Sequence, residues 1–391
     1  MAARNAISAG RRETQGSWPP MYHSFANQRR WTRSISGCAF LILFAVSVLS
    51  TIAGQQTPAS LEPGPKPADV PVKWKPWIGE YGLSSTPAAD DSVYLLSESD
   101  GVILLSIRHG QSDKAQYETV SKAAPRVVLP ADKSNAFQLY LSASHERLLH
   151  VGKVEDRKIT PDSDAPQQVL IKPVASIDQI RKEALKATPP EEKGPFRKPD
   201  LVELAPLDPA IHLEIRYATT NDFLGTAVYT QARAFMQRPA AEALVRALKK
   251  LQALGYGLLI HDAYRPWYVT KIFWDATPPE GKIFVADPSQ GSRHNRGCAV
   301  DLTLYDLASG KPIEMPGTYD EMSPRSFPDY PGGTSLQRWH RDLLRRAMES
   351  EGFAVYEHEW WHFDYKDWHE YPILNIKFED LNSGQGLASV H

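Results

Sequence analysis

Two proline-rich segments are predicted to divide this chain into separate domains. Residues 55–76 read QQTPASLEPGPKPADVPVKWKP, and residues 188–199 read TPPEEKGPFRKP. Proline lacks a backbone N–H and favours extended conformations, so both segments are predicted to be linkers. The predicted organisation is an N-terminal segment over 1–54, a linker over 55–76, a first domain over 77–160, a helix and linker over 161–199, and a second domain over 200–391.

The N-terminal segment has the order of a secretory signal peptide. Basic residues between Arg29 and Arg33 precede an apolar run from Cys38 to Ile52, and small residues before Gly54 offer a cleavage site. We therefore expect an exported protein of the periplasm or cell envelope of a bacterium. The alternative is an uncleaved membrane tether through residues 38–53, because the run is nearly long enough to span a bilayer.

Charge and cysteine content exclude two further classes. The formal net charge of -2 gives no electrostatic basis for a nucleic-acid partner. Of the two cysteines, Cys38 falls in the apolar run, so a mature chain would carry Cys298 alone and form no internal disulfide. The fold must then be held by its core, for which the chain is long enough. The oligomeric state stays open.

The segment 77–160 is predicted to be a small all-β domain. Short apolar runs alternate with Gly, Asp, Ser and Pro, and Asp100-Gly101 is a good two-residue hairpin turn. The runs are VYLLSES, GVILLSIRH, PRVVLP, AFQLYLSAS and RLLHVGKV. Trp77, Gly79 and Tyr81 resemble the W-x-G-x-Y pattern of small β domains appended to secreted hydrolases. The segment has no cluster of residues that would carry chemistry.

The segment from residue 200 onward mixes strand and helix patterns, which predicts an α+β fold. Period-two alternation and apolar runs indicate strands, whereas an apolar stripe at helical spacing followed by glycine indicates helices. The expected strands are 211–217, 256–264, 297–306 and 353–366, and the expected helices are 177–187, capped by Ser176, then 240–254 and 335–351.

Residues of the types that bind metal ions concentrate in two places of this second domain. The first place is residues 292–301. Asp301 lies in an apolar strand, where an acid is costly to bury unless it is paired or bound to a metal. His294 precedes it by seven residues, and Gly297 lets the backbone turn between them. A loop could therefore place His294 close to the strand that carries Asp301. The alternatives are a solvated loop histidine and a structural aspartate at a strand end.

The second place is His358-Glu359-Trp360-Trp361-His362, which matches the helical zinc motif H-E-x-x-H. The surrounding aromatic and β-branched residues favour a strand instead. The metzincin form would also need a third histidine at position 368, where the chain has Trp368. We therefore interpret the stretch as E-x-x-H, with a bulge or strand end that brings Glu359 and His362 to one site.

Together these residues complete a catalytic zinc site, which takes three N or O ligands and keeps one position open. His294, Asp301 and His362 are the candidate ligands. Glu359 is a carboxylate beside them that could take a proton from water and pass it to a leaving amine.

These residues also resemble a known family. The pattern S-x-H-x-x-G-x-A-x-D from Ser292 to Asp301, followed by E-x-W-H from Glu359 to His362, is similar to the signature of the D-alanyl-D-alanine dipeptidases. The stretches RYATTNDFLG, DAYRP and MPGTYDEMSPRSF look like the same family. The resemblance covers roughly residues 200–370 and implies a zinc D,D-peptidase fold with a central antiparallel sheet and flanking helices.

The resemblance implies a role for each matching residue. It makes His294, Asp301 and His362 ligands of one Zn²⁺ ion, and it makes Glu359 the catalytic base and acid. Further roles concern the substrate: Arg265 steadies the tetrahedral oxyanion, Asp320 accepts the free amino group of the dipeptide, and Ser292 adds a hydrogen bond. Arg265 could instead be a structural partner of an acid, and Asp320 a turn residue.

The activity that the resemblance implies is hydrolysis of D-Ala-D-Ala to two D-alanines in cell-wall peptide turnover. The rival functions are a peptidoglycan D,D- or L,D-carboxypeptidase of the same zinc fold and a non-catalytic zinc-binding wall module. Cys298 departs from the family pattern inside the metal motif. We expect it to be a small buried strand residue rather than a nucleophile.

Overall fold

The computed structural model describes residues 60–82, 93–109, 116–123, 137–142, 144–151, 154–159 and 170–381. The signal or tether predicted for residues 1–54 lies outside these ranges. Residues 58–391 form one compact unit, so both predicted domains belong to it. Within the described residues, no helix has the length and apolar character needed to cross a bilayer.

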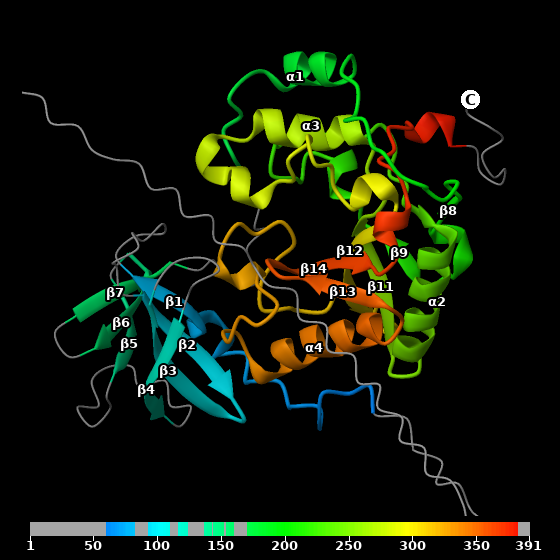
Figure 1. The fold of residues 1–391 in the computed structure, drawn as a ribbon. Helices are drawn as coiled ribbons and strands as arrows, with labels where there is room; N and C mark the ends of the chain where they lie inside the picture. The colour runs from blue at the N-terminus through cyan, green and yellow to red at the C-terminus, as the bar shows by residue number, and fades with distance from the viewer. Residues whose placement is uncertain are drawn as a thin grey trace, which may run out of the picture. The chain divides into compact units, whose positions relative to one another are not determined.

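A seven-stranded antiparallel sheet occupies the described part of residues 79–158 (Figure 1). Its order is β4-β3-β2-β1-β7-β6-β5. The strands are β1 (Gly79–Gly82), β2 (Val93–Ser99), β3 (Val102–His109), β4 (Gln116–Ala123), β5 (Gln138–Leu141), β6 (Arg147–Val151) and β7 (Val154–Lys158). Strand β4 was not predicted, and the expected strand PRVVLP lies outside the described residues.

The hairpin turn predicted for this sheet is confirmed by its geometry. Ser99 pairs with Val102, and the turn between them has φ 51° at Asp100 and 78° at Gly101, as a two-residue hairpin requires. The first and last residues of the W-x-G-x-Y pattern are joined by a hydrogen bond, because the buried Tyr81 hydroxyl donates to the Trp77 carbonyl at 2.7 Å.

The described part of the predicted linker 55–76 packs against the rest of the chain. Trp74 is 2% exposed and belongs to the core of the seven-stranded sheet, directly before the short 3₁₀ helix η1 (Lys75–Trp77). Lys66 donates to the Tyr256 hydroxyl at 2.7 Å. Burial of an indole outweighs the extended preference of the neighbouring prolines, so this stretch is anchored.

The second domain is built on a five-stranded mixed sheet with order β13-β14-β12-β11-β9. Neighbouring strands are antiparallel except β9 and β11, so the expected antiparallel sheet has one parallel edge. The strands are β9 (Ile211–Leu213), β11 (Tyr256–Asp262), β12 (Ala299–Asp306), β13 (Phe353–Tyr356) and β14 (Glu359–Tyr365). A separate pair joins β8 (Leu201–Glu203) to β10 (Phe235–Gln237).

Four α-helices accompany these sheets. They are α1 (Ile177–Ala184), α2 (Arg238–Gln252), α3 (Trp267–Ala276) and α4 (Ser335–Glu349). Helices α2 and α4 contact the five-stranded sheet, whereas α1 and α3 pack on each other at the top of Figure 1. The sequence did not predict α3, because the helix is buried on most sides and shows no amphipathic stripe. Ser176 precedes α1 but its side chain makes no capping hydrogen bond.

The expected continuous strand 353–366 is wrong, because the structure has a hairpin there. Strands β13 and β14 are antiparallel partners, with a register shift between Val355 and Tyr356. Glu357 and His358 form the turn, so β14 begins at Glu359. In that shift Val355 pairs with Phe363 but Tyr356 pairs with Glu359, so β14 is irregular between Glu359 and Phe363. This irregularity lets Glu359 and His362 approach each other within one strand.

The β2–β3 hairpin caps the first turn of α4. The buried Glu98 carboxylate accepts from Ser335 N at 2.8 Å and from Gly101 N at 2.6 Å. Arg338 donates to the Glu98 carbonyl at 2.7 Å. An acidic side chain at a helix N-terminus satisfies free amides and complements the helix dipole.

We expect Glu98→Ala to lower the free energy of unfolding by roughly 1–3 kcal/mol, since the backbone amides of Gly101 and Ser335 lose a charged acceptor. Chemical denaturation of the full chain measures this loss. Glu349→Ala is the matched control, because Glu349 is 40% exposed in a surface pair with Arg345 and should cost about 0.5 kcal/mol or less. Equal losses for the two variants would contradict a stabilising role for the cap.

Candidate active site

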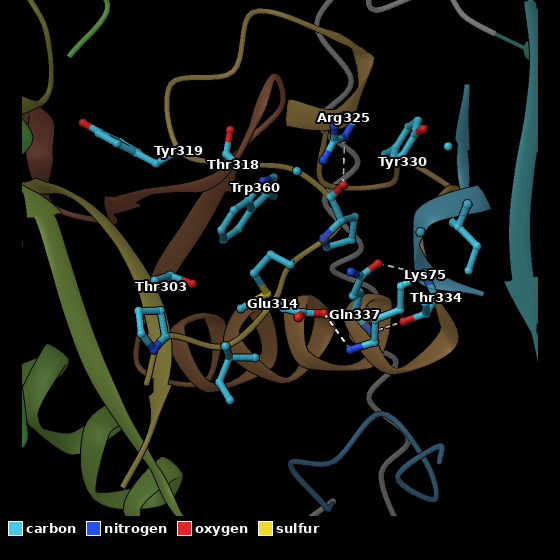
Figure 2. A pocket seen from close by; sticks show the side chains of 18 of the residues that line it. Lys75, Thr303, Glu314, Thr318, Tyr319, Arg325, Tyr330, Thr334, Gln337 and Trp360 are labelled. Carbon is cyan, nitrogen blue, oxygen red and sulfur yellow. Dashed lines mark hydrogen bonds and ion pairs between the residues drawn. The ribbon is translucent and has the colours of Figure 1, made fainter. Parts of the chain in front are cut away.

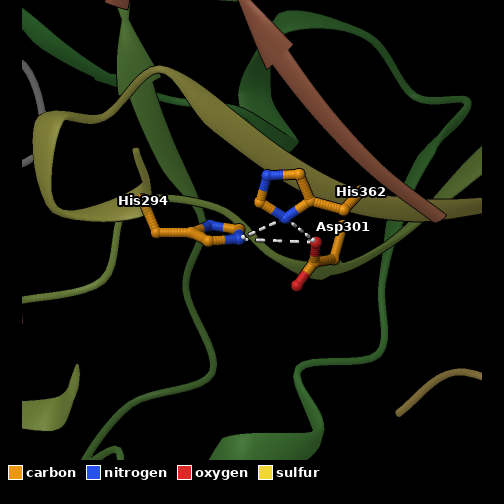
Figure 3. Close-up of side chains that lie close together, drawn as sticks. All are labelled: His294, Asp301 and His362. Atoms are coloured by element: carbon orange, nitrogen blue, oxygen red, sulfur yellow. Dashed lines mark hydrogen bonds and ion pairs between the residues drawn. The ribbon is translucent and has the colours of Figure 1, made fainter. Parts of the chain in front are cut away.

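Three side chains from separate segments converge on one point (Figure 3). His294 Nε2 lies 3.4 Å from Asp301 Oδ1, and His362 Nδ1 lies 3.0 Å from the same oxygen. The two imidazole nitrogens are 3.1 Å apart. All three residues are buried. The structure therefore brings together the three ligands that the sequence predicted.

The backbone explains this convergence. Asp301 on β12 and His362 on β14 are register partners in the antiparallel pair. His294 begins the 3₁₀ helix η6 (His294–Arg296), which ends at Gly297 with φ 69°. A Cβ at Gly297 would lie 2.5 Å from the Leu201 side chain, so both conformation and space require glycine there. The turn predicted from the sequence is present.

The outer nitrogens of both histidines are already engaged. His294 Nδ1 lies 2.6 Å from the Ala263 carbonyl oxygen, and His362 Nε2 lies 2.9 Å from Asp364 Oδ1. These oxygens only accept, so each outer nitrogen carries the proton in the neutral ring. The inner nitrogens then present lone pairs to each other and to a carboxylate.

Such an arrangement fits a bound cation. Asp301 Oδ1 is buried and has no hydrogen-bond partner among the described residues. Two ligands of a tetrahedral zinc, each about 2.0–2.1 Å from the ion, stand about 3.3 Å apart, which agrees with the separations found here. Three converging lone pairs without protons between them would repel, and a cation removes that repulsion. The residues present therefore fit a metal ion such as Zn²⁺.

Asp364 is a residue that the sequence reasoning missed, although it lies two positions after His362 on the same strand. We expect Asp364→Asn to weaken zinc affinity by about 10–100-fold, because partners that orient a metal-binding histidine contribute that much. Competition with a chelator of known affinity measures it. Unchanged affinity would show that the Ala263 and Asp301 contacts alone hold the two rings.

Glu359 lies beside this group. Its Oε2 is 3.7 Å from His362 Nδ1, and its side chain is 22% exposed to the pocket. Burial raises the pKa of the Glu359 carboxyl to about 7, and the nearby Asp301 charge acts in the same direction. A carboxyl with a pKa near neutrality is suited to take up and return a proton.

Arg265 has the acidic partner that one interpretation of the sequence gave it, and its oxyanion role stays a prediction. Its Nε and Nη2 donate to Asp262 Oδ2 at 2.8 and 2.7 Å, so it is a structural partner of an acid. The guanidinium also lies over the rings of Tyr217 and Phe273, and Nη2 is 3.8 Å from Asp301 Oδ2. Asp262 was not predicted, although the DAYRP stretch places it three residues before Arg265. A fixed, charged donor thus faces the metal group.

Asp320 reaches the site from a strained backbone position, with φ 59°. Its Oδ1 accepts from the Tyr217 hydroxyl at 3.0 Å, whereas its buried Oδ2 has no partner among the described residues. Burial, reinforced by the charges of Asp301 and Glu359, raises the pKa of the Asp320 carboxyl well above its usual range. A cation beside this oxygen would favour the ionised carboxylate and oppose the effect of burial.

Ser292 has a local role in the structure. Its Oγ accepts from His294 N at 3.2 Å, which fixes the turn that carries this histidine. Ser292 also lines the pocket, so a hydrogen bond to substrate stays a prediction.

The strand interpretation of residues 358–362 is confirmed for Glu359–His362, and the helical zinc motif is not formed, because His358 lies in the β13–β14 turn. Its ring packs on Phe327 and Tyr356 at 5.5 and 5.2 Å between centroids. Cys298 is fully buried, and burial raises the pKa of its thiol. Cys298 does not line the pocket that holds His294, Asp301 and His362, so the expected packing role holds.

One pocket of about 340 Å³ contains all of the candidate residues. They are Arg265, Ser292, His294, Asp301, Asp320, Glu359 and His362. Tyr217, Phe273 and Trp361 add aromatic walls. We call this cavity the catalytic pocket.

Comparisons with known proteins place similar sequences over the same part of the chain. A family model described as D-ala-D-ala dipeptidase matches residues 197–381. The D-alanyl-D-alanine dipeptidase of Escherichia coli K12 is 36% identical over 179 residues, which are 46% of this chain and 91% of that protein. Proteins of the same name from Enterococcus faecalis V583 and Streptomyces coelicolor are 35% and 34% identical, over 44% and 40% of this chain and 95% and 87% of their own lengths.

Proposed function

This chain belongs to the D-alanyl-D-alanine dipeptidase family, and from that premise we propose that it is an exported zinc peptidase that hydrolyses D-alanyl-D-alanine to two D-alanines. The observation that carries this proposal is the convergence of His294, Asp301 and His362 beside Glu359 in one pocket. Family membership supplies the hydrolase activity. The metal, the compartment and the role in cell-wall turnover belong to the proposal.

In this proposal His294, Asp301 and His362 hold the zinc ion. The chemistry that zinc supplies when bound is Lewis acidity at the scissile carbonyl and a lower pKa for a bound water. Glu359 takes a proton as water adds to the carbonyl carbon. It then gives the proton to the amide nitrogen as the C–N bond breaks, which releases two amino acids. Arg265 donates to the carbonyl oxygen as negative charge develops on it.

Asp320 would fix the substrate by its free amine. The unpartnered Oδ2 is suited to accept from an ammonium group, and Tyr217 holds the other oxygen. We expect Asp320→Asn to raise KM for D-alanyl-D-alanine by about 10–100-fold, the value of a hydrogen bond between charged groups. Steady-state kinetics measures this, and a change in kcat alone with unchanged KM would contradict amine binding by Asp320.

D-Alanine release by the purified chain tests the function directly. We expect D-alanyl-D-alanine to be split with zinc and not after chelation, and L-alanyl-L-alanine and a stem pentapeptide to remain intact. Trimming of the pentapeptide without cleavage of the dipeptide would instead assign a carboxypeptidase. Inactivity on every substrate despite bound zinc would leave a zinc-binding wall module.

The N-terminal sequence supports the proposed export. Basic residues followed by the apolar run 38–52 are typical of a signal peptide. N-terminal sequencing of the chain recovered from the cell envelope distinguishes cleavage near Gly54 from a retained tether. Recovery of the intact chain from the cytoplasm would contradict export.

A further inference from the structure

A second cavity lies where the seven-stranded sheet meets the five-stranded sheet (Figure 2). It measures about 310 Å³, which is close to the size of the catalytic pocket. Its walls come from η1 and β1 on one side, and from β11, β12, β14, the loop 312–319 and the start of α4 on the other. We call it the junction cavity. None of the roles assigned so far uses it.

Three side chains of this wall carry polar groups without partners. Among the described residues, Trp360 Nε1, Thr303 Oγ1 and Arg325 Nη1 find no hydrogen bond. Trp360 is 3% exposed and Thr303 is 6% exposed. A buried polar group left unpaired costs about 1–3 kcal/mol, so such groups normally mark bound water or a ligand. All three can donate, which favours a ligand that accepts.

The charge of the wall agrees with an anionic ligand. Four cationic side chains line the cavity against two carboxylates; they are Lys75, Lys158, Arg216 and Arg325 against Glu214 and Glu314. Both carboxylates have cationic neighbours, and two of the cations have further acidic partners: Lys75 Nζ lies 2.9 Å from Asp69 Oδ2, and Arg325 Nε lies 3.4 Å from Glu321 Oε1. Glu314 Oε2 is 3.0 Å from Lys75 Nζ, and Glu214 Oε1 is 3.8 Å from Arg216 Nε.

His261 adds no charge to this wall. Burial lowers the pKa of its imidazole to about 3, and the Arg216 charge acts in the same direction. The ring is therefore neutral, and the cationic excess of the wall does not depend on it.

Tyr319 separates the junction cavity from the metal group. Its ring stacks on His261 with 4.5 Å between centroids and forms part of the junction wall. Its hydroxyl donates to Asp301 Oδ2 at 3.1 Å. Asp320, the next residue, lines the catalytic pocket. A ligand in the junction cavity would thus touch a side chain that also contacts the proposed metal site.

We propose that the junction cavity is a second binding site, for a small molecule that carries a carboxylate. The carboxylate accepts hydrogen bonds from Trp360 Nε1 and Thr303 Oγ1, whereas Arg325 lies on the other side of Trp360 from Thr303 (Figure 2). Two sources share this chemistry: a plain organic acid and a free amino acid such as D-alanine. Only the choice of D-alanine as a probe rests on the proposed function.

Two adjacent tryptophans make the proposal directly testable. Trp360 lines the junction cavity, whereas Trp361 lines the catalytic pocket. In the full chain labelled with ¹⁵N-tryptophan, each indole N–H gives its own NMR signal, assigned with Trp360→Phe and Trp361→Phe. We would titrate the zinc-loaded protein with propionate, D-alanine and D-alaninamide, which lacks the carboxylate.

The expected result is a saturable shift of the Trp360 signal with propionate or D-alanine, on a binding curve separate from that of Trp361. A response to both identifies a general carboxylate site, and a response to D-alanine alone identifies an amino-acid site. An equal response to D-alaninamide would overturn the proposal, as would a Trp360 signal that stays still or that only follows Trp361. These outcomes do not depend on dipeptidase activity.

Thr303 provides a matched pair of variants. Thr303→Val keeps the shape and removes the hydroxyl, so it should weaken carboxylate binding at Trp360 by about tenfold. Thr303→Ser keeps the hydroxyl and should bind as the natural protein does. Equal affinity in the two folded variants would remove Thr303 from the site. Loss of binding in both would point to packing, and either outcome contradicts the proposed contact.

Discussion

Asp301→Ala should lose both the bound zinc and nearly all dipeptidase activity. The Asp301 carboxylate is the only anion of the three-residue metal group, and it lies 3.0 Å from one histidine and 3.4 Å from the other. We expect kcat/KM for D-alanyl-D-alanine to fall at least about a thousandfold, because metal catalysis lowers the barrier by several kcal/mol. Zinc per chain is measured by elemental analysis after gel filtration.

His358→Ala is the control for this variant. His358 is the first histidine of the H-E-x-x-H pattern. In the structure it lies in the β13–β14 turn against Phe327, outside the metal group. It should therefore keep one zinc per chain. Loss of zinc in His358→Ala together with retention in Asp301→Ala would reverse the ligand assignment.

Glu359→Gln should separate catalysis from metal binding. Glutamine keeps the size of the side chain but does not exchange a proton near neutral pH. We expect kcat to fall by about 10²–10⁴-fold, the usual contribution of a general acid and base. Zinc content should stay unchanged, because Glu359 Oε2 stands 3.7 Å from His362 Nδ1, outside the three-residue group.

Glu357→Gln is the matched control, since Glu357 is an exposed residue of the turn two positions earlier. It should keep the activity of the natural chain. If Glu359→Gln retained full kcat, the proton would have to move through another group of the pocket, and the assigned role would be wrong. If it lost zinc as well, Glu359 would be a ligand.

The sequence predicted best where spacing and chemistry act locally. Asp301 in an apolar strand and the glycine turn after His294 both follow from short-range rules, and the structure has them as expected. The reasoning also required a strand end or bulge between Glu359 and His362. The structure has both, because β14 begins at Glu359 and its pairing with β13 is irregular between Glu359 and Phe363, although the expected strand 353–366 is a hairpin.

The parts that sequence reasoning missed depend on distant contacts. The turn is formed by Glu357 and His358, and neither is one of the residue types, Gly, Pro, Asn or Asp, that predict a turn. The local sequence therefore did not predict the hairpin. Helix α3 is buried on most sides, so its sequence lacks the polar face from which an amphipathic helix is predicted. Asp262 and Asp364 support Arg265 and His362 only through tertiary packing. The junction cavity exists because two sheets meet, which no single motif encodes.

The backbone at Asp320 restricts how this enzyme could change its substrate. With φ 59°, this position lies in the left-handed region, where aspartate and asparagine are tolerated far better than longer or branched residues. A change to glutamate would extend the carboxylate but strain the chain, and asparagine would remove the charge. The reach of the proposed amine acceptor is thus set by the main chain. Divergence toward longer peptides is therefore expected to begin elsewhere in the lining of the catalytic pocket, at residues 283–287.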